Sequence, residues 1–552
     1  MSIRGSLYTL FRESAADYPD QSFLAVPGRL ASEWDITPEI TYRETLRRID
    51  ELAEVYAGKG FAEGDRVALA FESRPHYFFH YLALNSLGAC AVPLNTDLTA
   101  VEIAYQLAHS DCAAAVTLPT VAPLVREAIA LTGRAIALTV DNPGDLPPLR
   151  RTTDPRTYDD PLERPAAVLY TSGTTGNPKG CVLSNLYVQE SGRYYADLDG
   201  DVAVSPGAER MLNPLPLYHM NSMVTTAGAA IHNGACLVLP GRFSAGNWWN
   251  DVVDTRATRF NYLGIMIPAL LSLPETDTEK EHSVRFAFGA GVDPSAHRRF
   301  EQRFGISLME VWGMTETGRF LIVDREPRHI DTRACGRALP GLEAKIVDNR
   351  GRDLPDGETG ELVVRHTAAQ PRSGFFSGYL KDPDATEKAW EGGWFHSGDL
   401  CTRSPDGMFY FVDRSKNIVR RSGENISSAE VEAVLSASPL VAQVAVLAVP
   451  DAMRDEEVLA CVVLDPHISA DRATAGSLAA HARSQLAYYK VPGWIYFVEE
   501  LPTTGTQKIQ KHRIFPDGFS ADLPGLFDLR ATKKRGSTSE SAGIQARSST
   551  TN

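Results

Sequence analysis

Residues 170–180 bring together side chains that could bind a polyphosphate. Their sequence, Tyr-Thr-Ser-Gly-Thr-Thr-Gly-Asn-Pro-Lys-Gly, contains five hydroxyl side chains, three glycines and one lysine. Glycines let backbone N–H groups approach phosphate oxygens, hydroxyls can donate hydrogen bonds to them, and Lys179 supplies a positive charge. A Walker-type loop needs Gly-Lys-Ser/Thr at its end, whereas Gly180 follows the lysine here. The segment therefore predicts a phosphate-binding loop of another kind, formed by Thr171, Ser172, Gly173, Thr174, Thr175, Gly176 and Lys179.

The elements around this loop follow an α/β pattern. The loop comes directly after an apolar run, residues 166–170, which indicates a buried strand. Upstream, a helical pattern over residues 42–56 precedes a strand-like run at 66–71. A second helix–strand pair follows at 77–87 and 89–93. This βα alternation predicts layered subdomains with parallel strands.

The pattern changes in the last third of the chain. From about Gly341, short strands separated by turns predict a β-rich subdomain. Further on, Ser427-Ser-Ala-Glu430 reads as a capping box at the start of a helix. Strand and helix patterns then alternate and predict a compact α+β domain. We expect a large N-terminal domain over residues 1–413, a small mobile C-terminal domain over 414–525, and a disordered tail over 526–552.

Composition limits the classes of function. A chain of 552 residues is too long to fold around a single hydrophobic core, so two or more domains are expected. The net charge of −14 argues against nucleic-acid binding. The seven cysteines are scattered singly, so neither a zinc site nor a disulfide framework is indicated. No signal peptide and no apolar run of transmembrane length is visible. We expect a cytoplasmic protein.

The phosphate-loop segment resembles that of the adenylate-forming superfamily, which includes acyl-CoA ligases, luciferases and the adenylation domains of peptide synthetases. The resemblance continues in order from about Leu7 to Phe515. Residues 213–219, Asn-Pro-Leu-Pro-Leu-Tyr-His, resemble the acyl-pocket motif, which implies that His219 borders both the substrate carboxylate and ATP. The residues expected to line the acyl pocket are Tyr218, Met220, Asn221, Met223, Tyr262 and Phe288.

Two further segments resemble nucleotide-binding motifs of this superfamily. Residues 288–291, Phe-Gly-Ala-Gly, are similar to the turn that packs against adenine, where glycines permit the flat approach of a ring. Residues 311–316 are similar to a Tyr-Gly-x-Thr-Glu motif, with Trp312 in place of tyrosine, and either ring can stack on adenine. The resemblance implies that Thr315 donates to the α-phosphate and that Glu316 binds Mg²⁺. The other nucleotide-binding residues expected here are Gly289, Ala290, Gly291, Gly313 and Met314.

Residues 394–400 resemble the ribose-binding turn. The resemblance assigns the ribose hydroxyls to Asp399, because one carboxylate can accept two hydrogen bonds at once. It also implies that Arg414 contacts ribose or phosphate, and that Lys416 is the hinge of the C-terminal domain.

The motif holding the catalytic lysine is matched by residues 501–508, although Gln507 stands where glycine is commoner. Acid activation brings an anionic carboxylate to the α-phosphorus of ATP. Cations placed where negative charge develops therefore give the largest stabilisation of the transition state. The resemblance assigns this role to Lys508, with Lys179, His219 and Mg²⁺ on Glu316.

The acceptor of the acyl group is expected to be CoA. Residues 421–426 match the loop that lines the pantetheine tunnel in CoA ligases, so Ser422, Gly423 and Glu424 are expected to contact CoA. No aspartate near His219 could hold a substrate α-ammonium, and no carrier domain follows. The chain looks most like the carnitine/crotonobetaine–CoA ligase branch.

Alternatives to this assignment stay open at this point. A carrier protein or oxygen could be the acceptor in place of CoA, and medium-chain and aryl-acid ligases are also similar. A non-catalytic relative is not favoured, because both Lys508 and Glu316 are present. The expected partner is a small-molecule carboxylic acid, and a homodimer is left open.

Overall fold

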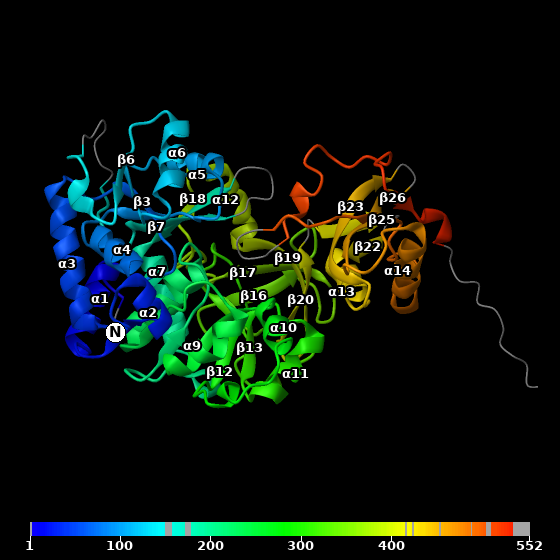
Figure 1. The fold of residues 1–552 in the computed structure, drawn as a ribbon, viewed down its shortest axis with the longest axis horizontal. Helices are drawn as coiled ribbons and strands as arrows, with labels where there is room; N and C mark the ends of the chain where they lie inside the picture. Colours follow the sequence, from blue (N-terminus) through cyan, green and yellow to red (C-terminus); the bar gives the residue numbers. More distant parts are fainter. Residues whose placement is uncertain are drawn as a thin grey trace, which may run out of the picture. The chain divides into compact units, whose positions relative to one another are not determined.

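The computed structural model describes residues 3–149, 157–171, 178–414, 417–421, 424–451, 454–486, 488–503 and 509–533. The chain divides into two compact units, Met1–Phe411 and Val412–Asn552 (Figure 1). The division falls inside one strand, β20 (Phe409–Arg414), two residues before the expected boundary. Among the described residues, none of the helices combines the length and apolar character needed to cross a bilayer.

A seven-stranded sheet in the first unit carries the predicted phosphate loop. Its order is β18-β8-β7-β4-β3-β5-β6. The five strands from β7 to β6 are parallel, and β8 pairs antiparallel with both β7 and β18. Thr171 at the end of β7 lies opposite Lys179 at the start of β8, so the two ends of the loop are held side by side. The strands are β3 (Arg66–Ala70), β4 (Cys90–Pro93), β5 (Ala114–Thr117), β6 (Ala137–Val140), β7 (Pro165–Thr171), β8 (Lys179–Ser184) and β18 (Gly378–Tyr379).

An eight-stranded sheet carries the acyl and adenine motifs. Its order is β14-β13-β12-β11-β9-β10-β1-β2, and the six strands from β13 to β1 are parallel. Because parallel strands end at one edge, the segments after β9, β11, β12 and β13 all emerge there, where ligands of α/β proteins bind. The strands are β1 (Ser22–Ala25), β2 (Glu39–Thr41), β9 (Arg210–Leu212), β10 (Cys236–Val238), β11 (Arg259–Leu263), β12 (Phe286–Ala290), β13 (Ser307–Gly313) and β14 (Phe320–Ile322).

Helices pack against both sheets around one continuous core, which includes Val67 of β3, Leu82 of α4, Tyr187 of α7 and Leu237 of β10. The helices of the first unit are α1 (Leu7–Asp17), α2 (Gly28–Trp34), α3 (Tyr42–Gly58), α4 (His76–Ser86), α5 (Ala100–His109), α6 (Ala122–Thr132), α7 (Asn185–Ala196), α8 (Ala227–Asn233), α9 (Trp248–Asp254), α10 (Met266–Leu271), α11 (Pro294–Phe304) and α12 (Pro383–Ala389). Short 3₁₀ helices are η1 (Pro143–Asp145), η2 (Gly200–Val202), η4 (Ala245–Asn247), η5 (Thr278–Lys280) and η6 (Glu391–Gly393), and η3 (Asn221–Thr226) is a π-helix.

The predicted β-rich subdomain is confirmed as a five-stranded sheet of order β15-β20-β19-β17-β16. The described pairings in this sheet are antiparallel. Its remaining strands are β15 (Ala334–Gly336), β16 (Glu343–Val347), β17 (Gly360–Arg365) and β19 (Phe395–Arg403).

Over its described residues, the second unit is the predicted α+β fold, a six-stranded sheet with two α-helices. Ser427 caps α13 as its sequence predicts, because its side chain accepts from the backbone N–H of Glu430 at 3.2 Å. The strands run in the order β22-β21-β24-β25-β26, and β23 pairs with β24. The elements are β21 (Ile418–Arg421), β22 (Glu424–Ser427), α13 (Ser428–Ser436), β23 (Val441–Asp451), β24 (Asp455–Leu464), α14 (Arg472–Gln485), β25 (Trp494–Phe497), η8 (Lys511–Arg513), β26 (Leu526–Asp528) and η9 (Arg530–Thr532).

The start of the expected tail at residue 526 was wrong. Residues 526–528 form strand β26, which pairs antiparallel with β25. The ring of Phe527 lies 5.4 Å from that of Phe497, centroid to centroid, and Leu529 is buried in the core of the unit. The polar composition begins only at Lys533, so residues 526–529 belong to the folded unit and not to the tail.

Candidate active site

The adenine and ribose motifs meet through a hydrogen bond. Trp312 lies near the end of β13, and its indole Nε1 donates to Oδ2 of Asp399 in β19 at 2.8 Å. Both side chains are buried. The backbone N–H of Asp399 also donates to Ser397 Oγ at 3.1 Å. Tryptophan stands here where the family motif has tyrosine, and tyrosine has no ring N–H. Trp312 therefore gives Asp399, the predicted ribose carboxylate, an indole donor.

The predicted adenine turn requires glycine because of its close contacts. A Cβ atom on Gly289 would lie 2.3 Å from the carbonyl oxygen of Tyr262, and one on Gly264 would lie 1.7 Å from that of Gly291. Gly291 has a φ of +82°, a conformation that residues with a side chain rarely adopt. The turn is therefore set by the backbones of β11 and β12, which pair in parallel.

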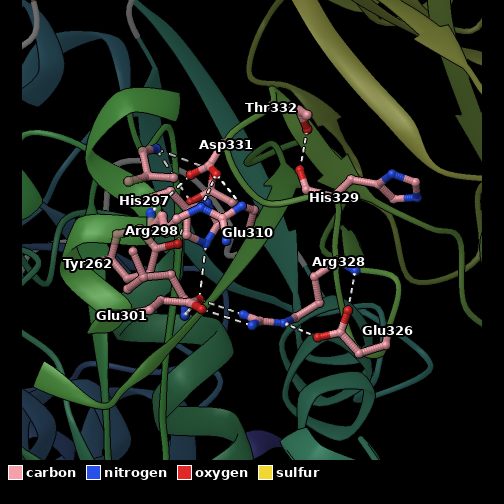
Figure 2. Close-up of polar contacts among 12 residues, drawn as sticks. Tyr262, His297, Arg298, Glu301, Glu310, Glu326, Arg328, His329, Asp331 and Thr332 are labelled. Atoms are coloured by element: carbon pink, nitrogen blue, oxygen red, sulfur yellow. Dashed lines mark hydrogen bonds and ion pairs between the residues drawn. The ribbon is translucent and has the colours of Figure 1, made fainter. Parts of the chain in front are cut away.

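A buried carboxylate, Glu310, lies against this turn. Its Oε2 accepts from the backbone N–H of Gly291 at 2.8 Å, and its Oε1 accepts from the hydroxyl of Tyr262 (Figure 2). Burial raises the pKa of Glu310 to about 7, although the hydrogen bond from Tyr262 opposes this shift. The nearby His297 shares a hydrogen bond of 3.2 Å with Glu301. Glu310 was not among the predicted residues, although a lone charge in the apolar run of β13 is a signal that could have found it.

The expected magnesium ligand and the expected phosphate-binding lysine share a neighbour, Tyr379. The Tyr379 hydroxyl donates to Oε1 of Glu316 at 2.9 Å, and Lys179 Nζ lies 4.7 Å from the centroid of the Tyr379 ring. Burial, together with Glu316, holds the pKa of the Tyr379 hydroxyl above its ordinary value. Next to Glu316, the carbonyl of Thr315 accepts from the Tyr187 hydroxyl at 2.6 Å. Tyr379 was also missed, because nothing in its local sequence marks it chemically.

The acyl-pocket motif forms the connection after β9. His219 is exposed, with its ring 4.7 Å from that of Tyr218, centroid to centroid. Asn221 begins the π-helix η3, and such short π segments are frequent at functional sites. Its Oδ1 accepts from the side-chain amides of Asn213 and Asn261, both at 2.9 Å.

The predicted pocket residues divide into two groups. Tyr218, Met220 and Asn221 are partly exposed. In contrast, Tyr262, Phe288 and Met223 are buried: Tyr262 bonds to Glu310, Phe288 stacks on Tyr195 at 4.5 Å, and Met223 Sδ accepts from Tyr77. These three side chains pack in the interior in this structure, because their strand and helix positions face the hydrophobic core.

Several predicted site residues lie outside the described part of the chain. They are Ser172, Gly173, Thr174, Thr175, Gly176, Lys416, Ser422, Gly423 and Lys508. Arg414 ends β20 and belongs to the second unit, and Glu424 begins β22.

Comparison with known proteins identifies the family. The sequence profile of the AMP-binding enzyme family matches residues 11–380, and that of the AMP-binding enzyme C-terminal domain matches residues 430–508. A sulfoacetate–CoA ligase from Cupriavidus necator is 32% identical over 517 residues, which cover 92% of this chain and 97% of that protein. A crotonobetaine/carnitine–CoA ligase from Citrobacter koseri is 32% identical over 495 residues, which cover 87% and 93%. Among solved structures, ATP-bound MatB from Rhodopseudomonas palustris matches with a TM-score of 0.76 at 25% identity, over 92% of this chain and 98% of that one.

The chain belongs to the AMP-binding enzyme family of the adenylate-forming superfamily. The predicted resemblance to this superfamily is confirmed, and crotonobetaine/carnitine–CoA ligases are among the similar proteins. The sulfoacetate–CoA ligase is equally similar, at 32% identity. Similarity to crotonobetaine/carnitine–CoA ligases therefore does not by itself identify the carboxylic acid substrate of this chain.

Proposed function

We propose that this enzyme is an ATP-dependent carboxylic acid–CoA ligase. It activates a carboxylic acid as acyl-AMP with release of pyrophosphate, and then transfers the acyl group to the CoA thiol, leaving AMP. The observation that carries the proposal is the hydrogen bond between Trp312 and Asp399, because it joins a ring suited to adenine with a carboxylate suited to ribose. The similar CoA ligases support CoA as the acceptor.

The nucleotide is proposed to lie at the C-terminal ends of the parallel strands of the eight-stranded sheet. Adenine packs between Trp312 and the turn at Gly289–Gly291, where Cβ atoms would fill the space or strain the backbone. The ribose hydroxyls donate to Asp399, and the phosphates lie at Thr171, Lys179 and the loop between them. Mg²⁺ fits Glu316, because this ion is commonly bound through one or two carboxylates together with phosphate oxygens and water.

In the first half-reaction the substrate carboxylate attacks the α-phosphorus, and pyrophosphate leaves. Both reactants are anionic, so the protein must supply positive charge and position the two in line. We assign charge stabilisation to Lys508 and Lys179, a donor to the α-phosphate to Thr315, and contact with the carboxylate to His219, which is exposed at the acyl motif.

In the second half-reaction the CoA thiol attacks the acyl carbonyl, and AMP leaves. The residues proposed to contact CoA are Ser422, Gly423 and Glu424. Because these residues and Lys508 belong to the same small unit, we propose that the unit turns about Lys416 between the two half-reactions. Cytoplasmic residence and a homodimer remain predictions.

The proposal is tested with a panel of acids, each incubated with ATP, Mg²⁺ and CoA. Sulfoacetate, crotonobetaine, carnitine, a medium-chain fatty acid and benzoate span the charged, aliphatic and aryl classes. At least one acid should release pyrophosphate and yield its CoA thioester together with AMP. Acid-dependent pyrophosphate release without thioester would point to another acceptor. ADP in place of AMP would contradict adenylation.

A further inference from the structure

Three charged side chains meet in the interior of the second unit, and we call them the Glu457 triad. Glu457 in β24 is fully buried, and the side chains of Arg421 and Lys533 are 3% and 1% exposed. Arg421 Nε donates to Glu457 Oε2 at 2.8 Å, and Lys533 Nζ donates to Glu457 Oε1 at 2.5 Å. One carboxylate therefore links the end of β21 to Lys533, which lies 76 positions after Glu457 in the sequence.

The backbone around Glu457 fits this arrangement closely. A Cβ atom on Gly493 would lie 2.5 Å from the carboxyl carbon of Glu457, so only glycine leaves room for that side chain. Gly493 also bonds to both neighbouring segments. Its N–H donates to Val458 O at 2.9 Å, and its carbonyl accepts from Leu529 N–H at 2.8 Å. The position of the carboxylate is thus fixed by the main chain.

The segment that carries Lys533 is held at several points. Strand β26 pairs with β25, and Arg530 Nη1 donates to Asp451 Oδ2 at 2.9 Å. The Arg530 guanidinium also lies 4.1 Å from the ring centroid of Trp494. Residues 526–533 therefore form an anchored segment that ends with its lysine inserted into the interior.

Stability alone does not account for a buried triad of this kind. Burial of two cations with one carboxylate carries a large desolvation cost, and apolar replacements of buried ion pairs are often neutral or stabilising. Burial lowers the pKa of Lys533 to about 8, while Glu457 opposes that shift. Buried charges can instead specify which segments meet, because only one arrangement pairs them.

The position of Arg421 indicates what the triad could specify. Arg421 is the last residue of β21, and it is the residue at which β21 pairs with β24, opposite Asp455. The next residues in the sequence, Ser422 and Gly423, are two of those proposed above to contact CoA. A constraint on Arg421 therefore acts directly before the proposed CoA contacts.

We propose that Lys533 is a positioning residue for the thioester half-reaction, because through Glu457 it fixes Arg421 and the end of β21. This inference rests on the proposed CoA ligase function. It gives the segment 526–533 a role in the second half-reaction and none in the first.

The test uses Lys533→Met in the full chain. This variant keeps a linear apolar side chain, and Arg421 still pairs with Glu457, so we expect the unit to fold. Acyl-AMP formation in a single turnover should stay close to wild type. Transfer from acyl-AMP to CoA should fall about 10- to 100-fold, the scale of a small misplacement at a reacting centre. Lys533→Arg, which restores a cation, should recover most of the transfer rate.

Lys490→Met is the matched control. It removes another lysine ion pair of the same unit, with Glu430 at 2.6 Å, but leaves the triad intact. Hydrogen exchange of residues 418–427 gives a readout that does not depend on activity. Exchange there should be faster in Lys533→Met and unchanged in Lys490→Met. If Lys533→Met does not fold, Lys533→Gln carries the comparison with smaller expected losses, because its shorter, uncharged side chain weakens the bond to Glu457.

The outcomes separate this inference from the proposed function. A wild-type enzyme that adenylates an acid but never acylates CoA would overturn the proposed function, while hydrogen exchange would still test the triad. Unchanged exchange in residues 418–427 of Lys533→Met, or an equal loss of both half-reactions, would overturn the positioning role. Selective loss of transfer together with rescue by Lys533→Arg would support it.

Discussion

The hydroxyl of Tyr379 donates a 2.9 Å hydrogen bond to Oε1 of Glu316, a residue 63 positions away in the sequence. The same ring lies under Lys179, with Nζ 4.7 Å from its centroid. Both contacts follow from one pairing. Strand β18 places Tyr379 opposite Cys181 in β8, the strand that begins with Lys179. One tyrosine therefore contacts both the proposed Mg²⁺ ligand and the proposed phosphate-binding lysine.

Tyr379→Phe should weaken the use of Mg²⁺. The substitution keeps the ring near Lys179 and removes only the hydroxyl that orients Glu316. Because partners that orient a metal ligand are commonly worth about 10- to 100-fold, we expect the half-saturating Mg²⁺ concentration for pyrophosphate release to rise about 10-fold. Tyr8→Phe is the control, since it removes a similar hydroxyl–carboxylate bond, to Asp50 at 2.8 Å, elsewhere in the same unit. Equal Mg²⁺ dependence in the two variants would contradict this role.

Trp312→Phe should impair ATP binding selectively. Phenylalanine can still stack on adenine, but it cannot donate to Asp399. Loss of a hydrogen bond to a charged group corresponds to about 1.5–3 kcal/mol, so the KM for ATP should rise about 10-fold or more. The KM values for the acid and for CoA should change little. Steady-state kinetics with each substrate varied in turn measures this, and a parallel rise in all three constants would contradict a nucleotide-specific role.

Glu310 should make the stability of the fold depend on pH. Its pKa rises from an ordinary value of 4.5 to about 7 in the folded protein. Between these values the folded state keeps a proton that the unfolded state releases. The resulting stabilisation is complete below about pH 4.5 and is lost as the pH rises through about 7, a change of roughly 3 kcal/mol.

Glu310→Gln cannot titrate, so it provides the comparison. The Tm of the wild type relative to this variant should fall between pH 5 and pH 8, as measured by thermal unfolding. The charged and titratable groups named around Glu310, which are Tyr262 and His297, stay the same in both proteins. Parallel Tm curves across this pH range would show that Glu310 does not titrate there.

Lys508→Ala should impair adenylation and spare transfer to CoA, which is the reverse of the effect expected for Lys533→Met. Lys508 is assigned to the α-phosphate in adenylation only, so acyl-AMP formation should fall by about 10²-fold or more. Transfer to CoA from supplied acyl-AMP should be largely spared. Rapid-quench measurement of each step makes the comparison, and the assignment is falsified if the variant forms acyl-AMP at the normal rate.

The sequence alone was sufficient for the features that depend on local chemistry. Strand patterns predicted α/β layers, a β-rich subdomain and an α+β unit, which the structure confirms. The glycine, hydroxyl and lysine content of residues 170–180 predicted a phosphate loop, which stays a prediction. These predictions are possible because turn residues, periodicity and motif spacing are encoded within short segments. The start of the tail at residue 526 was too early, because strand β26 pairs with β25 there. The resemblance assigned Tyr262 and Phe288 to the acyl pocket; both side chains are buried in this structure, and their place in the pocket stays a prediction.

The tertiary structure decided which distant side chains meet. Trp312 and Asp399 are 87 residues apart and lie in strands of different sheets, and Lys533 and Glu457 are 76 residues apart. Tyr379 carried no local signal and became visible only through its partner, the carboxylate of Glu316. The sequence marks Glu310 only as a lone charge in an apolar strand, and its partner, the N–H of Gly291, came from the structure. Such contacts depend on strand order and register, which are set by the packing of the whole core. A single sequence does not reveal that packing through local patterns.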